Sequence, residues 1–155
     1  MAPLVVLIVS FGVASLVLRL VRGQWSHGSA GRMAATAMFV FTGTSHFVFL
    51  DEMAEMVPPV FPAPRLWVLA TGVAEVLGGL GLLFTRTSRL SAWCLALFLV
   101  AVFPANVFAA IHQVGMGGHR EGLSYLWLRA PLQVIFLAWV VYFGILRGVR
   151  ASTPG

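Results

Sequence analysis

Long apolar runs, broken only by short polar stretches, are the dominant pattern along the chain. A helix needs about 20 mostly apolar residues to cross a bilayer, and the runs are of about that length. Because backbone polar groups in lipid must be paired within the segment, the runs should form helices. The sequence does not show the alternating segments of about 10 residues that are typical of a membrane barrel. We therefore predict an all-α integral membrane bundle with spans at 3–18, 33–50, 66–84, 90–111 and 130–146.

A proline-rich stretch separates the second and third runs. Residues 57–64 read Val-Pro-Pro-Val-Phe-Pro-Ala-Pro, with four prolines in eight positions. Proline lacks an amide hydrogen and holds the preceding residue in extended conformations. This stretch is therefore expected to be a stiff, non-helical loop at the outer mouth of the bundle.

The third run is rich in glycine, at Gly72, Gly78, Gly79 and Gly81. Small residues let helices in a membrane approach closely. We expect these glycines to shape the packing of the bundle and to have no chemical role.

Composition also indicates a membrane protein. Of the 155 residues, 59% are hydrophobic and only 10% are charged, against about a quarter charged in an average soluble domain. The mean hydropathy is +0.93. These values exclude a soluble globular enzyme, a disordered tail and a secreted disulfide scaffold. Cys94 is the single cysteine, which excludes an internal disulfide and a Cys-x-x-Cys redox pair.

The net charge of +5 comes from ten arginines against five acids, with no lysine. Seven arginines lie on one predicted side of the membrane: Arg19, Arg22, Arg32, Arg86, Arg89, Arg147 and Arg150. Since lysine and arginine favour the cytoplasmic side, we expect the C-terminus in the cytoplasm and the N-terminus outside. The excess charge is interpreted as a topology signal and not as a nucleic-acid-binding surface.

Three predicted spans contain polar pairs four residues apart: Thr42 and His46, Thr71 and Glu75, and Arg129 and Gln133. Residues at this spacing share one face of a helix, and polar faces in a bilayer turn away from lipid. We therefore expect the pairs to converge, together with Asn106, on one polar pocket in the outer half of the bundle. Pro104 should kink the fourth span and free a carbonyl near this pocket.

Glu75 is the only acid deep in a predicted span, and the cost of a charge in lipid makes a functional role the leading interpretation. The alternatives are a structural ion pair with Arg129 or a protonated carboxyl bonded to a neighbour. For His46 the alternative is an interhelical hydrogen bond. For Arg129 it is a side chain that reaches to the membrane interface.

Asn106 and Gln133 are typical of polar contacts that hold helices together, so packing is an alternative for both. His112 lies at the exit of the fourth span, where an ordinary surface position is the alternative. Because no His-x-x-x-His spacing supports a ligand set of His46, His112 and Glu75, no metal site is expected.

Six motifs, in order along residues 32–147, together resemble the DoxX-like family of small bacterial integral membrane proteins, in its uncharacterised subgroup. They are Gly43-Thr-Ser-His46-Phe, the 57–64 loop, Thr71-Gly-Val-Ala-Glu75, Gly78-Gly-Leu-Gly-Leu, Val102-Phe-Pro-Ala-Asn106 with His112 after it, and Leu128-Arg-Ala-Pro-Leu-Gln133. The resemblance implies a four-helix membrane core over 32–147. One extra transmembrane helix and a cytoplasmic linker precede it at 1–31, and a cytoplasmic tail follows at 148–155. The implied location is the bacterial inner (cytoplasmic) membrane, as a multi-pass protein.

The DoxX-like family takes its name from a subunit of a quinone-linked sulfur oxidoreductase. The resemblance thus implies a redox-associated protein, an oxidoreductase or the membrane subunit of one, with a quinone or another lipophilic small molecule in the polar pocket. Glu75 and His46 are the candidate catalytic residues, with Glu75 exchanging a proton. The ligand-binding candidates are Thr42, Thr71, Asn106, His112, Arg129 and Gln133.

Two further functions fit the same residues, because fold analogy alone does not choose between them. One is binding or transport of a small solute that enters from outside, with the proline loop as a lid. The other is a membrane scaffold that assembles other proteins without catalysis, so enzyme activity stays open. The expected partners are the bilayer and a lipophilic small molecule. A protein partner or a second copy of the chain is left open, and no nucleic acid is expected.

Overall fold

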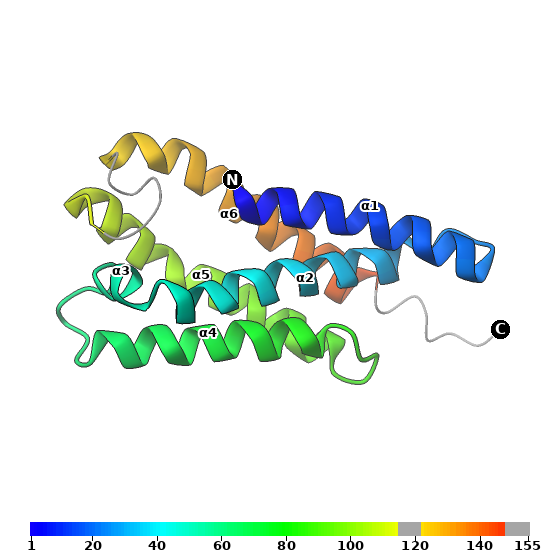
Figure 1. Cartoon of the computed structure of the whole chain (residues 1–155), viewed down its shortest axis with the longest axis horizontal. Coiled ribbons are helices and arrows are strands. Elements are labelled where there is room, and N and C mark those ends of the chain that lie inside the picture. Colours follow the sequence, from blue (N-terminus) through cyan, green and yellow to red (C-terminus); the bar gives the residue numbers. More distant parts are fainter. Residues whose placement is uncertain (115–121, 148–155) are drawn as a thin grey trace.

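The computed structural model describes residues 1–114 and 122–147, which are helical and contain no strand. The helices are α1 (Ala2–Arg22), α2 (His27–Val48), α3 (Leu50–Ala54), α4 (Pro64–Gly81), α5 (Ser88–His112) and α6 (Leu126–Val140), and a π-helical segment, η2 (Val141–Leu146), continues α6 (Figure 1). The predicted all-α fold is confirmed. The predicted tail at 148–155 lies outside the described residues.

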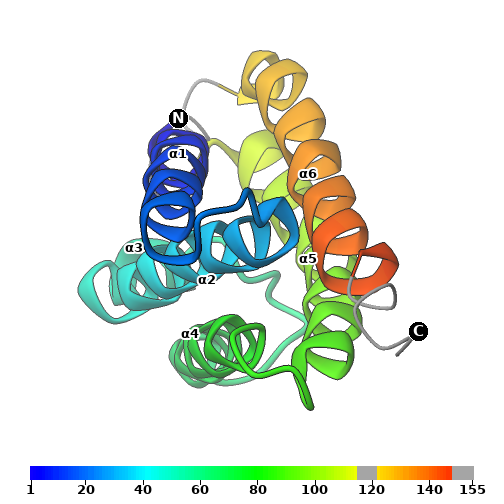
Figure 2. The ribbon, with the colours of Figure 1, turned by 90° about the vertical axis from the view of Figure 1, so that its right-hand side faces the viewer.

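Helix α2 lies at the centre of the bundle. It contacts α1, α4, α6 and η2, and the view along the long axis shows α1 and α4 on either side of it, with α5 and α6 on the remaining side (Figure 2). Every long helix of the described part is therefore packed against α2 or against a neighbour of α2.

The bundle has two ends of different character. One end holds the turns at 23–26 and 82–87 and the end of η2, whereas the other holds α3, the 55–63 loop and the end of α5 (Figure 1). Arg22 directly precedes the first turn, Arg86 lies within the second, and Arg147 follows η2. The arginine-rich segments thus gather at one end, while Arg150 lies outside the described residues.

Three helices in the described part are long and apolar enough to cross a membrane, at Ala2–Arg22, Ser88–His112 and Gly122–Leu146. By length and composition, a membrane location is therefore compatible with the fold. Helices α2 and α4, the other two expected spans, contain more glycine and threonine and are not in this set.

The helices differ from the predicted spans by a few residues at several ends, for example α1, which ends at Arg22, and α6, which begins at Leu126. Two differences are larger. Helix α2 begins at His27 instead of residue 33, because a charged side chain such as Arg32 near the end of a helix does not interrupt the backbone hydrogen bonding. Helix α3 (Leu50–Ala54) was expected as part of a loop. The predicted proline loop is confirmed as non-helical up to Ala63, and Pro64 opens α4, where its missing amide hydrogen has no cost.

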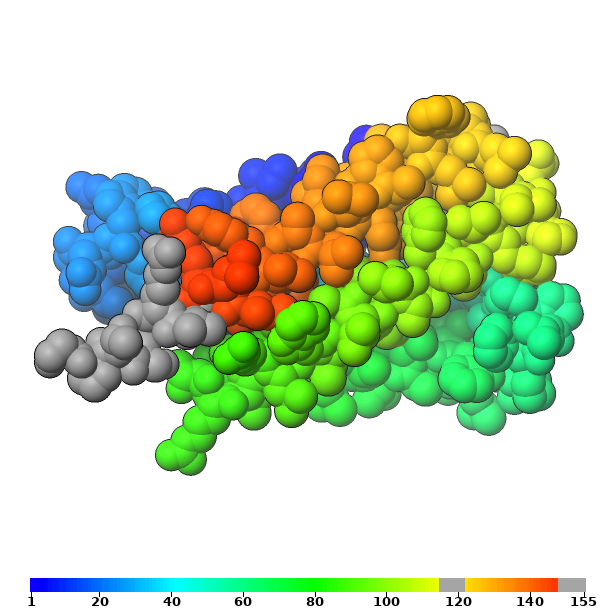
Figure 3. Space-filling view, turned by 180° about the vertical axis from the view of Figure 1, so that it is seen from behind, coloured from blue at the N-terminus to red at the C-terminus, as the bar shows by residue number. Residues whose placement is uncertain are grey.

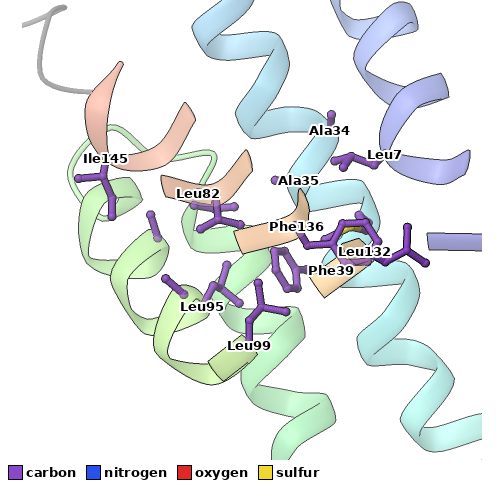
Figure 4. Close-up of a cluster of buried hydrophobic side chains, with 14 residues drawn as sticks. Leu7, Ala34, Ala35, Phe39, Leu82, Leu95, Leu99, Leu132, Phe136 and Ile145 are labelled. Atoms are coloured by element: carbon purple, nitrogen blue, oxygen red, sulfur yellow. The ribbon is translucent and has the colours of Figure 1, made fainter. Parts of the chain in front are cut away.

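A buried apolar cluster joins α1, α2, α5 and α6 (Figure 4). Alanines at its centre, Ala34 and Ala35, let the neighbouring helices approach α2, and Phe39, Leu99 and Phe136 fill the remaining space. This cluster forms the floor of the cavity described next.

Candidate functional site

Helices α2 and α4 are in very close contact where two glycines face each other. A Cβ atom at Gly72 would lie 2.7 Å from the Cβ atom of His46, and one at Gly43 would lie 2.9 Å from the carbonyl oxygen of Gly72. No larger residue fits either position without moving the helices. The expectation that glycines of the third run shape the packing is confirmed here, and the contact brings His46 next to α4.

A second contact fixes the register of the same two helices. Seven residues before Gly43, the Thr36 hydroxyl donates a hydrogen bond of 2.7 Å to the carbonyl oxygen of Gly79, which lies seven residues after Gly72. Seven residues correspond to about two helical turns, so the antiparallel helices stay in step along this length. The positions of His46 and Glu75 relative to each other follow from this register.

His46 is held by α4 through its Nδ1 atom. Nδ1 lies 3.0 Å from the carbonyl oxygen of Val68 and 3.1 Å from Oγ1 of Thr71. Since a carbonyl oxygen can only accept, Nδ1 bears a hydrogen and donates it to Val68, which leaves Nε2 of a neutral imidazole without one. Nε2 lies 3.8 Å from Oε1 of Glu75.

Glu75 is 7% exposed and only partly satisfied. The Thr42 hydroxyl and the Arg129 guanidinium also act on its carboxyl group. Among the described residues, however, neither Oε2 of Glu75 nor Nε of Arg129 has a hydrogen-bond partner, and no ion pair joins the two side chains there. A buried acceptor, Oε2 of Glu75, and a buried donor, Nε of Arg129, thus lack hydrogen-bond partners among the described residues, and we call them the open atoms.

The two amide side chains bond to carbonyls of α5. Gln133 on α6 donates through Nε2 to the carbonyl oxygen of Leu99, and Asn106 donates through Nδ2 to Val102 within its own helix at 3.0 Å. Helix α5 continues through Pro104, which has no amide hydrogen for the carbonyl of residue 100. Gln133 reaches the carbonyl immediately before that one, which belongs to Leu99.

A cavity of about 520 Å³ lies among these side chains in the half of the bundle that holds α3. Seven of the eight candidate residues line it: Thr42, His46, Thr71, Glu75, Asn106, Arg129 and Gln133. The structure therefore brings together the polar pairs of three helices as the spacing predicted. Met38, Phe39, Leu99, Leu132 and Phe136 belong both to its wall and to the apolar core, which closes it below.

His112 is not brought to the cavity. Its side chain is exposed, and Nδ1 lies 2.9 Å from the carbonyl oxygen of Phe108 in the same helix. Six residues beyond Asn106, it points about 240° around the helix from that residue. His112 therefore occupies an ordinary surface position, which was the alternative to ligand binding given for it in the sequence analysis.

The sequence did not predict the apolar residues that line the cavity. Four of the six methionines of the chain, Met1, Met38, Met53 and Met56, line the cavity, as does Tyr125. Methionine is unbranched and adapts to ligands of different shape. Nothing in the local sequence separates these residues from ordinary core or interface residues, so no signal could have assigned them to the cavity.

No three His, Cys, Asp or Glu side chains of the described part lie together as a metal site. The arrangement combines a buried acid next to a histidine, an open arginine donor and adaptable apolar walls. Such a site can hold the polar end of a largely apolar molecule and exchange a proton with it.

The fold and the site define a helical bundle, compatible with a membrane, that has a polar-lined cavity at one end. A family described as "Domain of unknown function (DUF8561)" matches residues 35–144, and the chain belongs to this family. The matched region contains all eight candidate residues and does not include α1. No curated protein and no solved structure matches the chain.

Proposed function

We propose that the chain is a five-span inner-membrane protein, with a DoxX-like four-helix core and α1 as an extra helix, that binds a lipophilic small molecule in the cavity. The polar end of this molecule pairs with Glu75 and Arg129, and the His46–Glu75 pair exchanges a proton with that polar end. The observation that supports this most directly is the pair of open atoms, Oε2 of Glu75 and Nε of Arg129, at one cavity.

The outer surface of α4 supports its role as a span. Leu77 is 64% exposed, and Val73 and Leu80 beside it are exposed as well, whereas the single acid of the helix interior, Glu75, points inward. Soluble monomers rarely expose large contiguous apolar surfaces. With α2 and α4 as spans and the arginine-rich end in the cytoplasm, the cavity opens toward the outer side of the membrane.

The energetic cost of open polar atoms supports a ligand. A buried polar atom without a partner costs about 1–3 kcal/mol, so a molecule that accepts from Arg129 and donates to Glu75 recovers that cost. A cavity of about 520 Å³ falls in the range of about 300–1,000 Å³ that is typical of small-molecule sites.

Proton exchange follows from the His46–Glu75 geometry. With Nδ1 of His46 committed to Val68, an attractive contact between Nε2 and the carboxyl group needs one proton, on either Nε2 or the carboxyl. A ligand oxygen beside Oε2 can take or return that proton. If the ligand is a quinone, the quinone supplies the redox chemistry and an external donor or acceptor supplies the electrons, while the chain supplies binding and the proton.

Equilibrium binding of the reduced, hydroquinone form of a short-chain ubiquinone analogue, whose hydroxyl groups can donate to Glu75 and accept from Arg129, to the purified protein tests the proposal. We expect saturable binding, weakened roughly tenfold or more in Glu75→Gln and in Arg129→Gln. Arg65→Gln is the matched control, because the Arg65 side chain is 68% exposed and pairs with Asp51. Absence of hydroquinone binding, together with a Glu75→Gln variant that behaves like the wild type, would overturn the proposal.

A further inference from the structure

The seam between α4 and α5 is closed at the arginine-rich end of the bundle. A Cβ atom at Gly78 would lie 2.8 Å from Cδ2 of Leu95, and one at Gly81 would collide with Oγ of Ser91. At these two levels the helices are therefore in direct contact, and nothing larger than glycine fits on α4.

Toward the other end, the same seam opens into the cavity. On α5, Phe98, Val102 and Ala105 follow Leu95 at spacings of three and four residues and so lie on the same side of the helix. On α4, Thr71 and Trp67 continue the side of Gly78 in the same way.

 All five of these residues line the cavity. Figures 1 and 2 show the two helices side by side near the 82–87 turn and further apart toward α3. Seen from behind, α5 runs obliquely between α6 and α4 (Figure 3).

The open part of the seam has an apolar lining on the outer side of the bundle. Trp67 is 48% exposed, Val102 and Ala105 are half-buried, and Thr71 places its hydroxyl within bonding distance of His46. An apolar chain can lie along these residues, because their side chains are apolar except for the Thr71 hydroxyl and the indole N–H of Trp67. The seam therefore leads from the lipid-facing surface to the polar residues.

The open atoms define the polar end of the molecule. A carboxylate oxygen at Glu75 accepts a hydrogen bond, and the Nε–H group of Arg129 donates one. A hydroxyl group both donates and accepts, so one hydroxylated end satisfies both requirements. A group that only accepts satisfies Arg129 alone.

We infer that the ligand is a single-chain amphiphile with a hydroxylated polar end, which enters sideways from the bilayer through the α4–α5 seam. This inference rests on the proposed function and adds the class of the ligand and its route. The polar end lies between Glu75 and Arg129, and the chain lies along Trp67, Val102 and Ala105. A cavity of about 520 Å³ accommodates one drug-sized molecule, which favours a single chain.

Two phenols that differ only in their chain test the route, with the protein in phosphatidylcholine nanodiscs. One probe is 4-dodecylphenol and the other is 4-methylphenol. Ala105→Trp fills the seam, and Ala101→Trp, on the exposed face of the same helix, is the control. We expect Ala105→Trp to weaken dodecylphenol binding roughly tenfold with methylphenol unchanged, and Ala101→Trp to change neither.

The outcomes separate the two proposals. Equal effects of Ala105→Trp on both phenols, or none on either, overturn the seam and leave the proposed cavity ligand standing. Binding of the oxidised quinone, which only accepts hydrogen bonds, without phenol binding overturns the hydroxylated polar end. Failure of the wild type to bind either phenol or a quinone overturns both proposals.

Photolabelling of the wild-type protein tests the seam without any variant, so its result does not depend on whether the variants fold. A dodecylphenol with a diazirine in its chain should label peptides that contain Trp67 or residues 98–105. Labelling confined to α1 or to the start of α2 contradicts the seam.

Discussion

Nε2 of His46 lies 3.8 Å from Oε1 of Glu75, across the contact between α2 and α4. The other ring nitrogen of His46 is committed to the carbonyl oxygen of Val68. The pair is therefore attractive only when it holds one proton between its two facing atoms. This relationship places a pair that can hold a proton at the wall of the cavity, where Oε2 of Glu75 has no hydrogen-bond partner among the described residues.

The glycine contact between α2 and α4 should be sensitive to a single methyl group. In Gly72→Ala the new methyl would lie 2.7 Å from Cβ of His46, so the helices must separate. We expect a loss of about 1–3 kcal/mol in the free energy of unfolding, measured by unfolding in detergent. Gly12→Ala is the control, since nothing lies within 4 Å of that position, and equal losses in the two variants would refute the close contact.

The register of α2 and α4 should depend on the Thr36 hydroxyl. Thr36→Val keeps the shape of the side chain but leaves the Gly79 carbonyl without its 2.7 Å donor. We expect destabilisation of about 1–3 kcal/mol in a thermal unfolding experiment. Thr44→Val is the control and should have little effect, because Thr44 is exposed and its hydroxyl bonds to Val40 in its own helix. A loss of stability in Thr44→Val as large as that in Thr36→Val would contradict the role of Thr36.

Gln133 should link α6 to α5 whether or not a ligand is present. Replacement by leucine removes the donor to the buried Leu99 carbonyl, which costs about 1–3 kcal/mol of stability. Unfolding of the ligand-free protein measures this loss. An unchanged stability would show that the amide serves only the ligand.

The ion pair between Arg65 and Asp51 should contribute little, although its atoms are only 2.6 Å apart. The two side chains are 68% and 69% exposed, and exposed pairs contribute about 0–1 kcal/mol. Arg65→Ala should therefore shift the unfolding transition only slightly. A large shift that added salt does not reduce would mean that the pair holds α3 against α4 more firmly than its exposure indicates.

The polar half of the site could be predicted from sequence because spacing determines which face a side chain occupies. Thr42 and His46, four residues apart on α2, line the same cavity, and the lipid-facing alternative is costly. His112 failed the same geometric criterion, since its position relative to Asn106 already placed it on another face.

The rest depended on tertiary contacts. Helix α3, with five residues, is too short to produce a periodic pattern, and two of its residues, Asp51 and Glu52, are typical of a loop. Met53 and Tyr125 become cavity residues only because distant helices meet around them. The register that brings His46 to Glu75 comes from Gly43, whose packing partner lies on another helix.

In the proposed function, Glu75 and Arg129 hold the polar end of a lipophilic molecule in the cavity. A mass spectrum of the lipid extract of the purified protein tests it most directly, with wild type, Glu75→Gln, Arg129→Gln and the Arg65→Gln control prepared in parallel. We expect an oxygen-bearing lipophilic compound to co-purify with the wild type and the control and to be depleted in the two cavity variants. Identical extracts from all four proteins would contradict it.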